Sequence, residues 1–280
     1  MTPRARRALR TAAAYATLAA AAALFVAPVV LMVVGSLKPN AQVLPEVGSW
    51  RGFVPVQASL DNYRAVFARV PFARYLLSSL IVNLGIVGGG LVVNSAAGYA
   101  LARLSFSGRR LALGTVLAIL VVPFEAIAVP LFFELTTLGL RNDYLVQILP
   151  FVANPLAIYL FYSFFLELPR ELEEAARVDG AGPLRTFLTI TVPNARPAFA
   201  SVAIVTLLLS WGMYLWPLLM TTGPAVRPLP LAIATFHTLP PLAWGDIMAF
   251  GVMMVSPVVV LFLALQRWFV RGVATSGIKG

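Results

Sequence analysis

The chain has 280 residues, of which 60% are hydrophobic and 11% charged, whereas soluble domains carry about 25% charged residues. This shortage of charge predicts a protein whose surface mostly contacts a lipid bilayer. The formal net charge of +10 would also suit nucleic acid, but the basic residues flank apolar runs, which favours a membrane protein that binds no nucleic acid. The absence of cysteine excludes disulfides, thiolate metal sites and a catalytic cysteine.

Six apolar runs are long enough to cross a hydrocarbon core that is roughly 30 Å thick. The first follows four arginines, as a signal peptide would, but it is too long and lacks a small-residue cleavage site. We therefore expect an all-α, polytopic membrane protein that forms one transmembrane domain over residues 1–280. The predicted spans lie near residues 14–37, 75–102, 111–132, 145–166, 198–221 and 246–269.

The basic residues are divided unevenly between the two sides of this predicted bundle. Fourteen lie in the two termini, the 103–110 turn and the 167–197 loop, and seven lie on the other side. Because loops rich in Lys and Arg stay in the cytoplasm, both termini are predicted to be cytoplasmic. We expect a multi-pass protein of a bacterial cytoplasmic membrane.

The second predicted span carries a G-x-x-x-G pair, Gly85 and Gly89. Missing side chains let two helix backbones approach closely, so this face is predicted to pack against another helix.

Several kinds of chemistry are excluded by the residues that are present. Neither Lys38 nor Lys279 is preceded by the glycine of a P-loop motif, so the chain has no nucleotide-binding loop of that type. The single histidine, His237, cannot build a zinc cluster without cysteine or further histidines. We therefore expect no metal, no cofactor bound by this chain and no catalytic residue, and we do not expect the chain alone to be an enzyme.

An acidic stretch in the 167–197 loop predicts a short helix over residues 169–179. Pro169 suits a first helical turn, and the acids that follow complement the positive end of the helix dipole. Glu173 and Arg177 are spaced for a favourable i,i+4 ion pair. One face would carry Leu172, Ala175 and Ala176.

Glycines then end this helix, and Gly180 is expected to adopt a positive φ. A second short helix is predicted from Leu184 to Thr191, before Pro193. A face of small side chains suits insertion into a groove on another protein, although a solvated amphipathic helix explains the same spacing.

The motif in this loop is specific. The stretch EAARVDG at 174–180, followed after nine residues by ITVP at 190–193, resembles the E-A-A-x-x-x-G-x9-I-x-L-P loop of permease subunits in binding-protein-dependent ABC importers. Val192 replaces the usual leucine. Further similar stretches are SLDNY at 59–63, AGYALAR at 97–103, FSGR at 106–109 and LGLRN at 138–142. The ending GVATSGIKG at 272–280 is similar to that of the carbohydrate-importer branch, which includes the maltose and glycerol-phosphate permeases.

This resemblance implies a type I ABC importer permease fold in which residues 171–182 form a coupling helix that docks on a cytoplasmic ATPase. The implied coupling residues are Glu174, Ala175, Ala176, Asp179, Gly180 and Ala181. It also implies a second homologous permease subunit, two copies of an ATP-binding subunit that use ATP and Mg, and an extracytoplasmic solute-binding protein. The composition of the C-terminal tail predicts a disordered terminus. The resemblance instead implies that Ser276, Gly277 and Lys279 lie at the ATPase interface.

Polar and aromatic side chains within the predicted spans are candidates for a substrate path. They are Glu125, Asn83, Asn94, Asn154, Trp211, Tyr214 and Trp216. Glu125 would also be tolerated at the outer end of its span, the asparagines would serve equally as hydrogen bonds between helices, and the aromatic residues as packing or interfacial groups. Gly212 stands where the family usually has asparagine, which weakens the case for a polar contact there.

The sequence thus favours a permease subunit for a sugar or a sugar-like solute. Alternatives are an importer permease for glycerol phosphate, a polyamine or a peptide, a stand-alone secondary transporter, and a scaffolding membrane protein. A secondary transporter would need an intramembrane ion site and usually inverted repeats, and neither is visible in the sequence.

Overall fold

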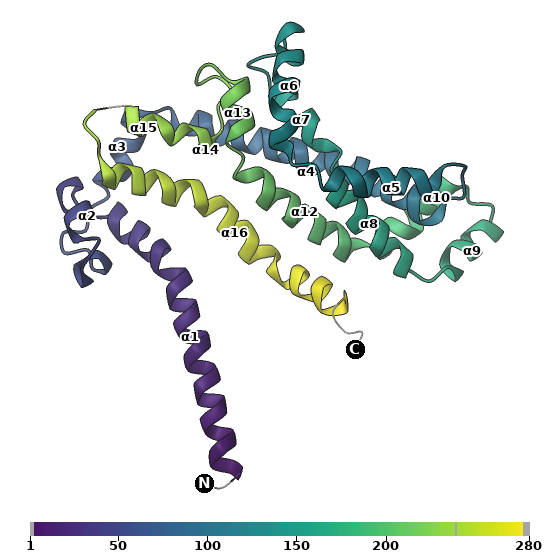
Figure 1. The fold of residues 1–280 in the computed structure, drawn as a ribbon, viewed down its shortest axis with the longest axis horizontal. Helices are drawn as coiled ribbons and strands as arrows, with labels where there is room; N and C mark the ends of the chain where they lie inside the picture. Colours follow the sequence, from purple (N-terminus) through teal and green to yellow (C-terminus); the bar gives the residue numbers. More distant parts are fainter. Residues whose placement is uncertain (1–2, 239, 277–280) are drawn as a thin grey trace. The chain divides into compact units, whose positions relative to one another are not determined.

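The computed structural model describes residues 3–238 and 240–276, with side chains for residues 10–238 and 240–264. Every regular element in these residues is helical, as predicted (Figure 1). In chain order they are α1 (Pro3–Ser36), α2 (Asn40–Glu46), η1 (Trp50–Phe53), α3 (Asp61–Arg69), α4 (Phe72–Arg103), α5 (Arg109–Leu120), α6 (Phe124–Thr137), α7 (Tyr144–Val152), α8 (Pro155–Glu167), α9 (Glu171–Val178), α10 (Pro183–Thr186), η2 (Phe187–Thr191), α11 (Val192–Asn194), α12 (Arg196–Trp211), α13 (Leu215–Met220), α14 (Leu229–Ala232), α15 (Ala234–Thr238) and α16 (Trp244–Ser276).

Three helices are individually long and apolar enough to cross a membrane. They are α1 over Arg10–Ser36, α4, and α16 over Trp244–Ala264. Each coincides with a predicted span, because a long apolar run in lipid must satisfy its backbone hydrogen bonds internally, and a helix does so. Pro28 in α1 and Pro257 in α16 are accommodated within the helices.

The remaining apolar runs form bent pairs of helices. α5 and α6 meet at 96°, and α7 and α8 meet at 42°. Both breaks occur just before or at a proline, Pro123 and Pro155, which lacks the N–H that would continue the helix ladder. The predicted third and fourth spans are therefore not straight helices. If each bent pair is one span, the chain has up to six spans by length and composition.

The predicted fifth span, 198–221, differs most from the structure. α12 ends at Trp211, Gly212 is its C-cap residue, and α13 starts only at Leu215. The helical segment Pro183–Asn194 and α12 together have the length and hydropathy of a span. The two are bent by 80° at Ala195.

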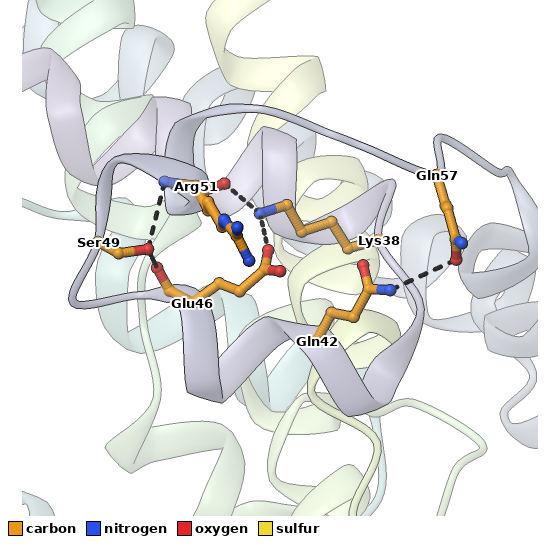
Figure 2. A network of polar contacts seen from close by, with 6 residues as sticks. All are labelled: Lys38, Gln42, Glu46, Ser49, Arg51 and Gln57. Atoms are coloured by element: carbon orange, nitrogen blue, oxygen red, sulfur yellow. Dashed lines mark hydrogen bonds and ion pairs between the residues drawn. The ribbon is translucent and has the colours of Figure 1, made fainter.

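Backbone contacts divide the chain into two compact units, and the first comprises residues 1–72 with 233–256. In this unit a buried lysine holds the segment that follows α1 (Figure 2). Lys38 is 2% exposed, and its Nζ donates to Glu46 Oε2 at 2.7 Å and to the Arg51 carbonyl oxygen. One cation thus fixes the end of α2 and the start of η1 over the end of α1, and both of its polar partners come from the same short segment.

The SLDNY stretch has a structural role in the same unit. Asn62 Nδ2 donates to the carbonyl oxygens of Ser36 at 2.8 Å and Lys38 at 2.7 Å. Tyr63 Oη lies 2.7 Å from Ser36 Oγ. Since the last carbonyls of a helix have no partner within it, these side chains complete the C-terminal end of α1. The motif therefore anchors α3 to the point where the first long helix ends.

The second unit comprises residues 73–232 with 257–280, and within it α4 packs closely against α7 and α8. A Cβ added at Gly85 would lie 2.6 Å from Ile148 Cδ1, and one at Gly89 would lie 3.2 Å from Val152 Cγ2. At Gly98 the added atom would lie 2.7 Å from Phe161 Cβ and 2.9 Å from a backbone nitrogen. The predicted interface at Gly85 and Gly89 is thus confirmed, and it extends along α4 to Gly98.

The LGLRN turn joins α6 to α7 in the same unit and fixes the end of α13. Gly139 has a φ of +72° and Asn142 a φ of +56°, the left-handed backbone that glycine and asparagine tolerate best. Asn142 Oδ1 accepts from Thr222 N at 2.7 Å, and Arg141 donates to the Leu219 carbonyl at 3.0 Å. The turn thereby satisfies backbone groups at the C-terminal end of α13.

Candidate functional site

The acidic stretch forms α9 within the loop that links α8 to α12. The helix starts at Glu171, two residues after the predicted start, and ends at Val178. Gly180 has a φ of +79°, as predicted, and Ala181 N donates to the Ala176 carbonyl at 2.9 Å. This is the left-handed ending that glycine permits without a steric cost, and it reverses the chain toward α10.

The second helical segment of this loop is longer than predicted. It runs from Pro183 through the π-helical turn η2 to Asn194, and Pro193 lies inside it rather than beyond it. A proline in an α-helix clashes with the carbonyl four residues earlier, and the wider π turn that precedes Pro193 is one way a helix accommodates this. Asn194 Nδ2 also donates to the Ile190 carbonyl at 2.7 Å.

The faces of α9 differ from the predicted grouping. Ala176 and Glu173 are buried within the chain, whereas Ala175 and the neighbouring Glu174 are exposed. Of the remaining implied coupling residues, Asp179 and Gly180 are exposed and Ala181 is half-buried. The exposed surface of the loop combines acidic groups with large apolar side chains, Val178 at 88% exposure and Leu184 at 70%.

Glu173 pairs with an arginine that is distant in the sequence. The expected partner was Arg177, one turn along α9, but Glu173 Oε1 lies 3.4 Å from Nε of Arg103, at the C-terminal end of α4. Arg103 also donates through Nη2 to the carbonyl oxygen of Leu168. The side chains are 3% and 9% exposed for Arg103 and Glu173, so the pair lies inside the protein.

A separate cavity of about 580 Å³ lies within the second unit, between α6, α8, α12 and α13. Four of the predicted substrate-path residues line it, namely Glu125, Asn154, Tyr214 and Trp216. Glu125 and Tyr214 are exposed, whereas Trp216 is 1% exposed and its Nε1 donates to the Val146 carbonyl at 2.9 Å. Asn154 Oδ1 accepts from Ala157 N at 3.1 Å and so caps the start of α8.

The cavity also contains polar residues that the sequence analysis missed. Thr206 and Ser210 line it from α12. Their spacing of four residues places both on one face of a helix, and this was the available signal for a polar stripe in an apolar run.

The other three predicted substrate-path residues are absent from the residues that line this cavity. Asn83 donates to the Ser79 carbonyl at 2.8 Å and accepts from Ser210 Oγ at 2.6 Å. Asn94 Nδ2 donates to the Val152 carbonyl at 2.9 Å, and its Oδ1 accepts from Asn154 N at the same distance. Both amides therefore connect helices, and Trp211 is buried.

The predicted tail site lies largely outside the described residues. Ser276 is the last residue of α16, while its side chain, Gly277 and Lys279 are not described. Among the described residues, no three His, Cys, Asp or Glu side chains are grouped closely enough to hold a metal ion. His237 is exposed, with its ring 6.2 Å from that of Trp244.

Known proteins resemble this chain over most of its length. Residues 94–275 match the family model described as "Binding-protein-dependent transport system inner membrane component". The arabinooligosaccharides transport system permease protein AraQ of Halalkalibacterium halodurans is 34% identical over 90% of this chain and 91% of its own. The trehalose transport system permease protein SugB of Mycobacterium tuberculosis is 35% identical over 88% of this chain and 89% of its own.

One solved structure supports the fold. A chain in the crystal structure of a bacterial ABC transporter, involved in the import of the acidic polysaccharide alginate, superposes with a TM-score of 0.81. The match covers 96% of this chain and 99% of the other at 21% sequence identity, so it shows a shared fold.

The bridging role of Asn94 gives a testable prediction. Replacing it with leucine of similar size removes the partners of the Val152 carbonyl and the Asn154 N–H at the break between α7 and α8. Each buried backbone group left without a partner costs about 1–3 kcal/mol. We expect Asn94→Leu to lower the thermal unfolding midpoint of the purified protein clearly.

The matched control is Ser95→Ala, because Ser95 Oγ donates to the Val92 carbonyl within its own helix and does not bridge two helices among the described residues. Its unfolding midpoint is expected to stay near that of the unmodified protein. Equal midpoints for Asn94→Leu and Ser95→Ala would contradict the bridging role.

Proposed function

Because the chain belongs to the family of inner membrane components of binding-protein-dependent transport systems, we propose that it is a permease subunit that imports a sugar or a sugar-like solute. The relatives named above are permeases of arabinooligosaccharide and trehalose systems. In this proposal ATP and Mg are used by two copies of a separate ATP-binding subunit. A second permease subunit completes the path, and an extracytoplasmic protein delivers the solute.

The observation that carries the solute class is the composition of the cavity between α6, α8, α12 and α13. A carboxylate, Glu125, and the hydroxyls of Thr206 and Tyr214 lie among apolar and aromatic walls. A sugar offers hydroxyl groups to such acceptors and an apolar ring face to an aromatic side chain. This mixture suits a neutral polyhydroxylated solute.

The same cavity argues against an anionic solute. The sn-glycerol-3-phosphate transport system permease protein UgpE of Yersinia pestis is 35% identical over 74% of both chains, which makes a phosphate ester the second candidate. Among the described residues that line the cavity there is no Lys or Arg, while Glu125 contributes a negative charge. A phosphate would meet repulsion from Glu125 without a compensating cation, so the neutral sugar is favoured.

The exposed surface of α9 supports coupling to the ATP-binding subunit. Val178 and Leu184 present apolar area next to Glu174 and Asp179 in a loop whose inner side is fixed by Glu173. Large apolar side chains at this level of exposure fit a surface that another protein covers. With the 167–197 loop and both termini in the cytoplasm, α9 would dock on the ATPase and pass its movement to the spans.

The cavity predicts a specific defect in solute recognition. Glu125→Gln removes a charge that would strengthen a hydrogen bond to a sugar hydroxyl, and such bonds contribute about 1.5–3 kcal/mol. In proteoliposomes of the complete importer we expect the half-saturating sugar concentration to rise about tenfold. The assay is ATP-dependent uptake of a panel of labelled oligosaccharides, with glycerol phosphate as the competing candidate.

Glu134→Gln is the matched control, since Glu134 is an exposed carboxylate on the same helix, α6, and does not line the cavity. It is expected to leave uptake unchanged. Uptake driven by an ion gradient without ATP would contradict the importer and favour a secondary transporter, and preferred uptake of glycerol phosphate would contradict the sugar.

The turn after α9 predicts a defect in coupling. A Cβ at Gly180 meets no atom within 4 Å, so the only penalty for Gly180→Ala is the left-handed backbone, roughly 1–2 kcal/mol. We expect this strain to displace α9 and to lower the amount of solute transported per ATP hydrolysed.

Gly182→Ala is the control, because Gly182 also has open space around its Cα but an ordinary φ of −72°. The ratio of solute to ATP is measured in the same proteoliposomes for both variants. A normal ratio in Gly180→Ala would show that the conformation of this turn does not matter for coupling.

A further inference from the structure

Arg103 links the end of α4 to two points of the 167–197 loop, which is distant from it in the sequence. It is the last residue of α4, and its guanidinium contacts the Leu168 carbonyl after α8 and the Glu173 carboxylate in α9. Its Nη2 donates a hydrogen bond to the Leu168 carbonyl, while its Nε faces Glu173 Oε1 in an ion pair at 3.4 Å that lacks hydrogen-bond geometry. Lysine has a single point charge and would not reproduce this geometry.

The surroundings of the pair make it costly to break. Tyr99, one turn earlier in α4, packs its ring 6.1 Å from Phe165 and 4.9 Å from Phe187. These rings belong to an apolar cluster that also contains residues of α8 and α12. Removing one member of a buried ion pair leaves an uncompensated charge at the edge of this cluster, which is strongly unfavourable.

The contact between α4 and α9 depends on this ion pair because packing beside it is incomplete. A second cavity of about 580 Å³ lies between the end of α4 and the loop, lined by Arg103, Phe106, Glu173, Arg177 and Pro183 among others. Side chains that face a cavity lose dispersion contacts on that side. Beside this cavity, the Arg103–Glu173 ion pair is a direct polar link between the end of α4 and α9.

We propose that Arg103 is a positioning residue that makes α4 move together with α9 during the transport cycle. The peptide chain connects α9 to α8 on one side and, through α10, η2 and α11, to α12 on the other. The Arg103–Glu173 pair adds a third connection, to the helix whose glycine face lies against α7 and α8. This inference rests on the proposed coupling function, and it identifies the span that receives the movement in addition to the two that flank the loop.

The absence of cysteine in the sequence allows a direct distance measurement. Spin labels are placed at Ser107→Cys, in the turn after α4, and Glu171→Cys, at the start of α9; both side chains are exposed. The distance between the labels is measured by pulsed EPR in the assembled importer without nucleotide and with ATP trapped in a hydrolysis-deficient ATPase. We expect the same distance in both states when Arg103 and Glu173 are intact.

The variants Arg103→Met and Glu173→Gln are expected to make this distance differ between the two states. Solute transported per ATP should fall about fivefold or more, within the range of coupling between sites. Arg103→Lys keeps the positive charge but not the planar guanidinium. Its ratio of solute to ATP should lie between those of the unmodified chain and Arg103→Met. Arg110→Met, which changes an exposed arginine in the adjacent helix, should behave as the unmodified chain.

Glu173→Gln preserves side-chain volume, so it carries the test if Arg103→Met prevents assembly. If Glu173→Gln keeps the same label distance in both nucleotide states and a normal ratio of solute to ATP, this inference is overturned but the proposed function is not. A complex of the unmodified chain without solute-stimulated ATP hydrolysis would overturn the proposed function and this inference with it.

Discussion

The close approach of α4 to α7 and α8 is the constraint on which the second unit depends. A Cβ at Gly98 would clash with Phe161 and with the Tyr162 backbone, and one at Gly85 or Gly89 would force Ile148 or Val152 to shift. Because the helix backbones approach so closely, Asn94 can reach across and bond both the Val152 carbonyl and the Asn154 N–H. These are the groups that the break between α7 and α8 would otherwise leave without partners inside an apolar region, where each would be costly.

The contact of α4 with α7 and α8 positions residues of both candidate sites, the cavity and the loop that contains α9. Asn154 starts α8 and lines the cavity with Glu125 and Tyr214, so the helix break that Asn94 supports also shapes the wall of the cavity. At the other end of α4, Arg103 reaches Leu168 and Glu173 because α8 ends beside it. One helix thus connects the cavity that we propose to bind a sugar with the loop that we propose to dock on an ATPase.

Local sequence patterns were sufficient for the helices that are continuous and for the turn after α9. The apolar runs of α1, α4 and α16 each specify a long helix, and Gly180 adopts the predicted positive φ. The glycine pair in α4 correctly predicted a helix–helix contact, because a helix face without side chains in a membrane commonly packs against another helix. The family resemblance, which rested on the loop motif, agrees with the family match.

Tertiary relations were not accessible from the same patterns. Pro123 marked a possible break, but the 96° between α5 and α6 depends on what the two helices contact. Asn83 and Asn94 were compatible both with helix contacts and with a substrate path, since an amide in an apolar run satisfies either role. Glu173 had a suitable partner one turn away in Arg177, and only the fold brings Arg103 closer.

The proposed function requires that the exposed side of α9 docks on a separate ATP-binding subunit. Val178→Cys would introduce a single thiol at an 88% exposed position of this surface, in a chain without other cysteines. Its reaction rate with a membrane-impermeant maleimide is measured in inside-out vesicles, with and without the co-expressed ATPase. The account predicts rapid labelling of the permease alone and strong protection in the complex, whereas equal labelling in both would contradict it.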